Sequence, residues 1–134
     1  MVTWLRRAGL AVVFVWFFVG GISHFTNPEF FFAIMPPWVP FHAAAVYLSG
    51  ALEIAFALGL LLPATRLWAG YLLIALTLAV TPANVHMWLN PQLFPDVSEA
   101  VLGWRLVVQV LLLALIWWST RSPQTERRQA VDLD

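Results

Sequence analysis

Four long apolar runs dominate this sequence and leave only short connecting segments between them. They cover about residues 4–24, 43–62, 66–88 and 101–120. A helix of about 20 apolar residues crosses the roughly 30 Å hydrocarbon core of a bilayer. We therefore predict an all-α fold, a transmembrane four-helix bundle that forms a single membrane domain over residues 1–134.

Composition supports lipid as the surrounding solvent. Hydrophobic residues make up 61% of the chain and charged residues 10%, whereas about 25% of the residues in soluble domains are charged. A chain of this length cannot bury so much apolar surface within itself. The formal net charge is zero and no basic patch is present, which argues against nucleic acid as a partner. The absence of cysteine excludes disulfides, thiolate metal sites and dithiol redox chemistry.

Arginine placement predicts how the four spans are oriented. The loops over residues 25–42 and 89–100 contain neither lysine nor arginine. The other side of the predicted bundle holds six of the seven arginines: Arg6, Arg7, Arg66, Arg121, Arg127 and Arg128. Positive side chains near span ends stay in the cytoplasm. We therefore predict cytoplasmic termini, with a cytoplasmic tail over residues 121–134.

The first apolar run has a second interpretation, because Arg6 and Arg7 precede it as they would precede the core of a secretory signal peptide. No small-x-small cleavage site follows the run cleanly. The paired arginines are therefore interpreted as an anchor that fixes the orientation of a retained span.

Polar side chains within the spans gather in the predicted outer half of the bundle. Glu53 lies near the midplane of the second span, and Arg105 and Gln109 share one face of the fourth. Such groups are costly in lipid and usually face the bundle interior, where they find partners. The candidate ligand-binding residues are His24, Glu53, Asn84, His86, Arg105 and Gln109.

Two interpretations of this cluster stay open at the level of sequence. In the first, the cluster receives a small molecule. In the second, Glu53 and Arg105 form a buried pair that fixes helix register. The third span carries one stripe of small residues and one polar stripe that includes Thr77, Thr81 and Asn84, and we expect one of these stripes to meet the face of Glu53.

The segment over residues 26–42 is too apolar for a solvated loop and too short to span. Asn27 followed by Pro28 and Glu29 is typical of a helix start. We predict a short interfacial helix or re-entrant segment between the first two spans. It either anchors the protein among the lipid headgroups or forms a lid over a cavity, with Phe31, Met35 and Trp38 as the lid residues.

Several short motifs resemble one family of membrane proteins. They are GISHF at 21–25, MPPWVPF at 35–41, SGALEIAFALGLLLPATR at 49–66, TPANVHMWLN at 81–90 and RLVVQ at 105–109. Together they resemble the DoxX-like family of bacterial integral membrane proteins, over residues 8 to 120. The resemblance implies a location in the bacterial cytoplasmic membrane. It also implies that the family's polar landmarks fall on His24, Glu53, Asn84, Arg105 and Gln109.

Some members of that family accompany redox systems, including a thiosulfate to quinone oxidoreductase and a superoxide-detoxifying assembly. The first functional hypothesis is a protein that binds a quinone or another small amphipathic molecule in the outer polar cluster, because costly polar groups from all four spans converge there. The alternative is a non-catalytic anchor or assembly subunit of a redox complex, which would contact other subunits or associate with itself.

Catalysis and metal binding find less support in the sequence. An enzyme would use His24 or His86 near Glu53 as an acid and base, but no nucleophile is paired with a base at a recognised spacing. The three histidines also show no recognised metal-ligand spacing with Glu53. We therefore predict no catalytic residues and no metal site.

Overall fold

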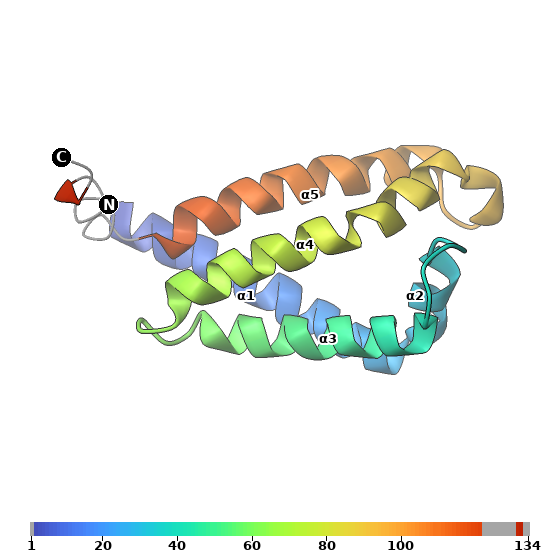
Figure 1. Ribbon diagram of the computed structural model, residues 1–134. Helices are drawn as coiled ribbons and strands as arrows, with labels where there is room; N and C mark the ends of the chain where they lie inside the picture. The colour runs from blue at the N-terminus through green and yellow to red at the C-terminus, as the bar shows by residue number, and fades with distance from the viewer. Residues whose placement is uncertain (1, 122–130, 133–134) are drawn as a thin grey trace.

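The computed structural model describes residues 2–121 and 131–132, and its regular elements are all helices. In chain order they are α1 (Val2–Thr26), α2 (Pro28–Ile34), α3 (His42–Gly59), α4 (Arg66–Leu89), a short 3-10 helix η1 (Pro91–Leu93) and α5 (Glu99–Thr120) (Figure 1). Helices α1, α3, α4 and α5 are long and apolar enough to cross a membrane. The predicted all-α, four-helix class is confirmed. Arg127 and Arg128 of the predicted tail lie outside the described residues.

The long helices match the predicted spans closely, except at the end of the second. That helix, α3, ends at Gly59 rather than near residue 62. The turn that follows caps its free carbonyl groups with side chains: Thr65 Oγ1 donates to the oxygen of Gly59 at 2.8 Å, and Arg66 Nε donates to the oxygen of Leu60 at 2.9 Å. These bonds satisfy groups that a helix end otherwise leaves without partners.

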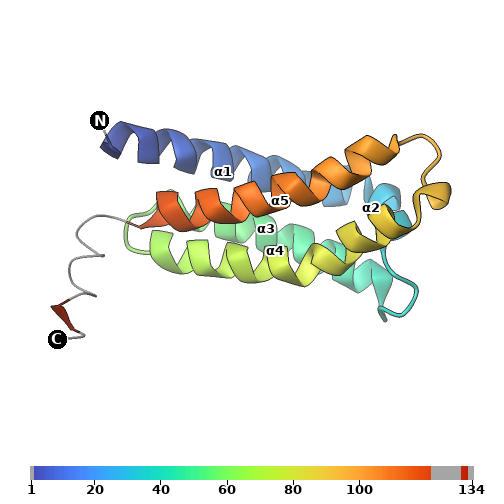
Figure 2. The same cartoon turned by 90° about the horizontal axis from the view of Figure 1, so that it is seen from above.

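The four long helices form a ring made of two pairs. Helix α1 packs along α3 and α4 packs along α5, while α1 also contacts α5 and α3 contacts α4 (Figures 1 and 2). The start of α1, the turn between α3 and α4 and the end of α5 lie at one end of the ring. We call this the arginine end, because Arg6, Arg7, Arg66 and Arg121 are there. The opposite end, which carries α2, we call the cavity end.

The core is split between the two ends. The larger cluster joins all four long helices and consists of Val13, Phe17, Ala57, Leu60, Ala69, Leu73, Leu112 and Ile116. A smaller cluster at the cavity end joins α2 to α4, α5 and the segment between them, through Ile34, Met87, Phe94 and Leu102. Most other residues of the long helices are exposed or only partly buried, as expected where the surrounding solvent is lipid.

Helices α1 and α3 approach each other most closely at two glycines. A Cβ atom on Gly50 would lie 2.5 Å from the Cβ of His24, and one on Gly21 would lie 2.8 Å from the oxygen of Gly50. Small residues of this kind let membrane helices pack backbone against backbone. The contact brings His24 of α1 beside Glu53 of α3.

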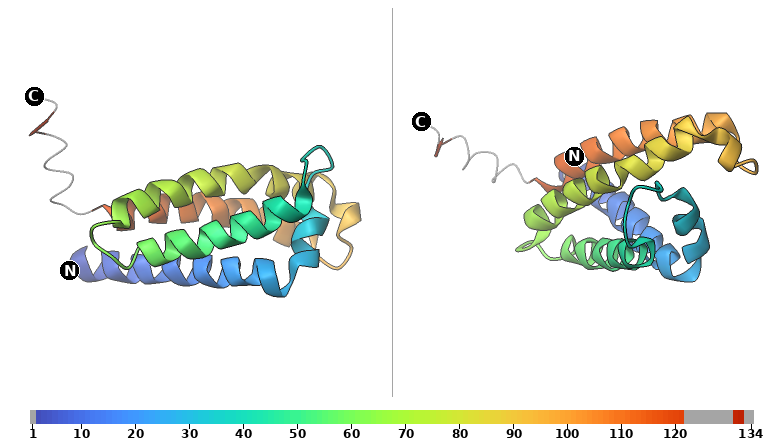
Figure 3. Two further views of the ribbon diagram at one scale, coloured as in Figure 1. Left: turned by 60° about the horizontal axis from the view of Figure 1, so that its bottom comes forward. Right: turned by 45° about the vertical axis from the view of Figure 1, so that its right-hand side comes forward.

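Helix α2 confirms the predicted short helix between the first two spans. It starts at Pro28 after Asn27, as the sequence pattern indicated, and ends at Ile34. Helix α2 contacts α1, α3 and α4, so it crosses the cavity end of the ring (Figure 3). Its position places α2 across the space between the two helix pairs, and Phe31 lines that space.

Candidate functional site

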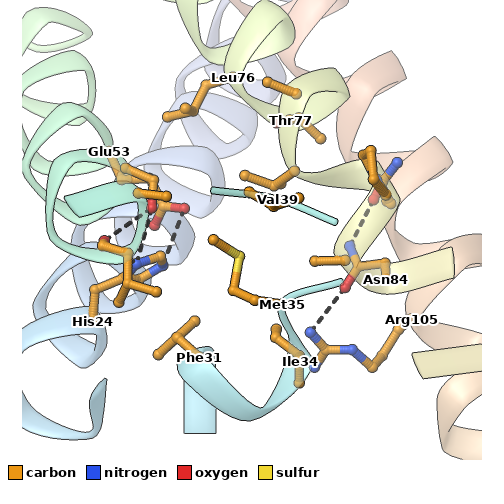
Figure 4. A pocket seen from close by; sticks show the side chains of 18 of the residues that line it. His24, Phe31, Ile34, Met35, Val39, Glu53, Leu76, Thr77, Asn84 and Arg105 are labelled. Carbon is orange, nitrogen blue, oxygen red and sulfur yellow. Dashed lines mark hydrogen bonds and ion pairs between the residues drawn. The ribbon is translucent and has the colours of Figure 1, made fainter. Parts of the chain in front are cut away.

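A cavity of about 990 Å³ lies between the two helix pairs at the cavity end. Most of its lining is apolar and comes from all four long helices, α2 and the segment that follows α2. In Figure 4, Glu53 and His24 lie on one side of it and Asn84 and Arg105 on the other. The predicted candidates that line it are His24, Phe31, Met35, Trp38, Glu53, Asn84, Arg105 and Gln109.

One polar cluster on the wall is built from α1 and α3. The side chains of His24 and Glu53 are only 8% and 12% exposed, and Nε2 of the histidine lies 3.6 Å from Oε1 of the glutamate. His24 Nδ1 lies 2.8 Å from the oxygen of Val46 and 3.2 Å from Oγ of Ser49. A carbonyl oxygen only accepts, so Nδ1 must carry a proton. The contact between Nε2 and Oε1 is longer than a hydrogen bond, and it is an ion pair when the imidazole carries a second proton.

The second polar cluster joins α4 and α5 through a directed chain of hydrogen bonds. Arg105 Nη2 donates to Asn84 Oδ1 at 3.0 Å, and Asn84 Nδ2 donates to Gln109 Oε1 at 2.8 Å. Gln109 Nε2 then donates to Thr81 Oγ1 at 2.6 Å, and Thr81 donates to the oxygen of Thr77 at 2.9 Å. Each acceptor in the chain is fixed by the donor that precedes it, so the chain sets the orientation of both amides.

The predicted pairing of Glu53 with Arg105 is wrong. Glu53 pairs with His24, and Arg105 donates to Asn84. The physical reason is the order of helices around the ring, in which α3 neighbours α1 and α4 while α5 neighbours α4 and α1. The cavity lies between α3 and α5. The polar residues Thr81 and Asn84 of α4 accordingly bond to α5 rather than to the face of Glu53.

Helix α2 contacts both polar clusters through neighbouring phenylalanines. The ring of Phe31 stacks on His24, with 3.8 Å between ring centroids and 26° between planes. The ring of Phe30 lies 5.8 Å from the guanidinium carbon of Arg105. Met35 and Trp38 line the cavity just beyond the helix, and Trp38 is 72% exposed. This segment therefore covers the cavity end of the space.

One predicted candidate, His86, does not line the cavity. Its Nδ1 lies 3.3 Å from Asn90 Nδ2, within the last turn of α4. Asn84 and His86 are two residues apart, which places them on different faces of a helix. His42 also lies elsewhere, with its Nε2 at 3.2 Å from the oxygen of Pro36.

The candidate binding residues predicted from sequence did not include Phe30, Ser49 and Thr81, although Thr81 was placed on the polar stripe of the third span. Ser49 lies one turn before Glu53 on α3, and Thr81 lies one turn before Asn84 and Val85 on α4. Shared helical faces could have indicated both hydroxyls. In contrast, nothing in the run of three phenylalanines distinguishes Phe30 from Phe32.

Across the described ranges, no group of three or more His, Cys, Asp or Glu side chains is placed to hold a metal ion.

Comparison with known proteins gives a family but no relative of known activity. A family model described as a domain of unknown function (DUF8561) matches residues 10–120. No curated protein and no solved structure matches the chain. The matched range includes α2, every polar residue of the cavity wall and all of the core clusters. The chain belongs to the DUF8561 family.

Proposed function

We propose that this chain is a DoxX-like integral membrane protein that binds a quinone or another small amphipathic molecule in the cavity between its helix pairs. The observation that carries the proposal is an apolar cavity with polar clusters on two opposite walls. Ligand sites are typically apolar spaces of about 300–1,000 Å³ with a few polar groups that fix orientation. The size and lining of this cavity fit that description.

The polar groups suit a flat ring with an oxygen at each end. Arg105 offers N–H donors on one wall, and the carboxyl group of Glu53, when protonated, offers a donor on the other. A quinone carries carbonyl oxygens on opposite sides of its ring, and its apolar body would lie among side chains such as Leu52, Leu76 and Val80. The DoxX-like resemblance of the sequence motifs supports the same choice of ligand.

The cavity also reaches the lipid-facing surface, as a membrane-soluble ligand requires. Lining residues Leu48 on α3 and Pro82 on α4 are exposed, and so are Trp16 on α1 and Trp104 on α5. An apolar molecule dissolved in the bilayer could therefore enter between helices without crossing the aqueous phase. Its hydrophobic tail could remain in lipid while its ring occupies the cavity.

A matched pair of tryptophan substitutions tests the binding proposal. Leu76 lines the cavity, whereas Leu72, one turn earlier on α4, is 45% exposed and does not line it. Leu76→Trp should weaken binding of a decyl-substituted benzoquinone by about tenfold or more, equivalent to about 1.4 kcal/mol, because the larger side chain fills the space. Leu72→Trp should leave binding unchanged. Calorimetric titration of the protein in lipid nanodiscs measures both.

Two results of that titration would count against the proposal. One is the absence of quinone binding to the unaltered protein, beyond its partition into protein-free nanodiscs. The other is an equal loss of binding in both variants, because it would place the quinone on the surface of α4 instead of in the cavity.

We further propose that the protein lies in the bacterial cytoplasmic membrane with its arginine end on the cytoplasmic side. The support is the gathering of Arg6, Arg7, Arg66 and Arg121 at one end of the ring. A fluorescent protein fused after Asp134 should fluoresce, and alkaline phosphatase fused at the same place should be inactive. Strong phosphatase activity from that fusion would contradict this orientation.

A further inference from the structure

Arg105 is a charged group of the cavity wall that has no counter-ion among the residues that the structure describes. A guanidinium stays protonated in proteins and carries five N–H donors. The contacts of Arg105 are one hydrogen bond to Asn84 Oδ1 and the ring of Phe30. Within residues 2–121 and 131–132 no carboxylate forms an ion pair with it, and its buried Nε atom finds no acceptor.

The other charged residues of the cavity do not balance this cation. Glu53, on the opposite wall, already has His24 as its partner, with 3.6 Å between Oε1 and Nε2. If His24 is protonated, the pair is neutral as a whole, and if Glu53 is protonated instead, both members are neutral. In either case the positive charge of Arg105 remains. A charge removed from water without a partner is costly.

The hydrogen-bond chain behind Arg105 positions the guanidinium without neutralising it. Asn84 presents Oδ1 to the arginine because its Nδ2 is committed to Gln109, and Gln109 is in turn committed to Thr81. The chain ends on a backbone oxygen of α4, so every group in it is neutral. It holds the arginine at the wall and leaves N–H groups at the Nη atoms available to a ligand, whereas Nε is buried.

We infer that the molecule bound in this cavity is an anionic amphiphile, with a singly charged acidic head group paired with Arg105 and an apolar body along the cavity. This inference rests on the proposed function, and among the amphipathic molecules proposed there it selects one with an acidic head group over a neutral quinone. A planar guanidinium matches a carboxylate or a similar oxyanion with two parallel hydrogen bonds. Arg105 supplies a single positive charge, so a second negative charge on the same molecule would lack a partner in the cavity.

Three probes with the same decyl tail test the charge of the head group: decanesulfonate, decanol and decyltrimethylammonium. The sulfonate and ammonium charges do not depend on pH. Each probe is titrated calorimetrically into the full-length protein in nanodiscs of zwitterionic lipid, and protein-free nanodiscs provide the blank. Decanesulfonate should bind at least about tenfold more tightly than decanol, since hydrogen bonds to charged groups each contribute more than about 1.4 kcal/mol. The ammonium probe should bind most weakly.

Variants then test whether the tighter binding of decanesulfonate than of decanol depends on Arg105. Arg105→Gln keeps a hydrogen-bonding side chain without charge, and it should reduce the ratio of sulfonate to decanol affinity to near one. Arg105→Lys keeps the charge and should retain part of that ratio. Arg7→Gln removes an exposed arginine at the arginine end, and it should leave the ratio unchanged. The comparison of probes on the unaltered protein needs no variant, so the test stands even if Arg105→Gln fails to fold.

The possible outcomes separate this inference from the proposed function. Equal binding of decanesulfonate and decanol would overturn the anionic head group while cavity binding stands. A preference for the sulfonate that persists in Arg105→Gln but is lost in Arg7→Gln would also overturn it, because the charge would then act at the arginine end. If no probe and no quinone binds, the proposed function itself fails.

Discussion

Replacing Gly50 with alanine is expected to lower the free energy of unfolding by about 2 kcal/mol, within the range of about 1–3 kcal/mol that is typical of overpacked cores. The added Cβ would lie 2.5 Å from the Cβ of His24 and 3.1 Å from the oxygen of Gly21. The first contact is far shorter than a van der Waals distance, and the second is too short by a few tenths of an ångström. Helices α1 and α3 would have to move apart, and their separation would also open the pair formed by His24 and Glu53.

Gly103 of α5 provides the matched control for this substitution. A Cβ there would meet its nearest atom, Nε1 of Trp88, at 3.8 Å, which is an ordinary contact. Alanine is favoured over glycine in a helix by about 0.8–1.0 kcal/mol, so Gly103→Ala should be neutral or slightly stabilising. Unfolding by sodium dodecyl sulfate in mixed micelles, followed by circular dichroism, measures both variants. Equal effects at the two sites would contradict the close approach of α1 and α3.

Replacing His24 with leucine is expected to destabilise the protein by about 3 kcal/mol, the low end of the range for breaking a buried pair. The change removes the partner of Glu53, the hydrogen bond to the oxygen of Val46 and the ring on which Phe31 stacks. The same substitution at His86 removes only a local contact with Asn90 outside the cavity. We expect His86→Leu to change stability by less than about 1 kcal/mol.

The double variant His24→Leu with Glu53→Leu sharpens this prediction. Replacing both members of a buried pair with apolar residues is often neutral, so the double variant should be more stable than His24→Leu alone. The same unfolding measurement in mixed micelles gives the coupling energy between the two positions. Additive losses from the two single variants would show that His24 and Glu53 do not act as a pair.

The four membrane helices could be predicted from sequence because each is encoded locally by an apolar run of the required length. Helix α2 could also be predicted, since Asn27, Pro28 and Glu29 form a local start signal. The end of α3 was misplaced by a few residues because side chains of the following turn cap the helix at Gly59 and Leu60. That capping depends on the shape of the turn and not on hydrophobicity.

The candidate site could be predicted only in part. The cost of polar groups in lipid correctly indicated that His24, Glu53, Asn84, Arg105 and Gln109 face a common interior. Their pairing could not be derived in this way, because it depends on which helices are neighbours in the ring. Helical phase within α4 excludes His86 from the face of Asn84, and that distinction was available from the sequence. The cavity itself depends on how the two helix pairs diverge, which is a property of the whole bundle.

The arrangement assigns different tasks to the two ends of the bundle. Toward the arginine end, apolar side chains of all four long helices pack together. At the cavity end, α2 bridges the helix pairs and touches both polar clusters through Phe30 and Phe31. The packed half of the bundle toward the arginine end holds the two walls of the cavity at a fixed separation. A preformed binding site requires such a fixed separation.

The central claim is that a small amphipathic molecule occupies the cavity between Glu53 and Arg105. A crystal structure grown in a lipid mesophase with a brominated decyl benzoquinone, and a second with a brominated decanesulfonate, would locate each ligand by the anomalous signal of bromine. Our account predicts bromine within the cavity in at least one of the two crystals, with the head group in contact with Arg105. Bromine found only on the lipid-facing surfaces of the helices, with the cavity walls packed together, would contradict it.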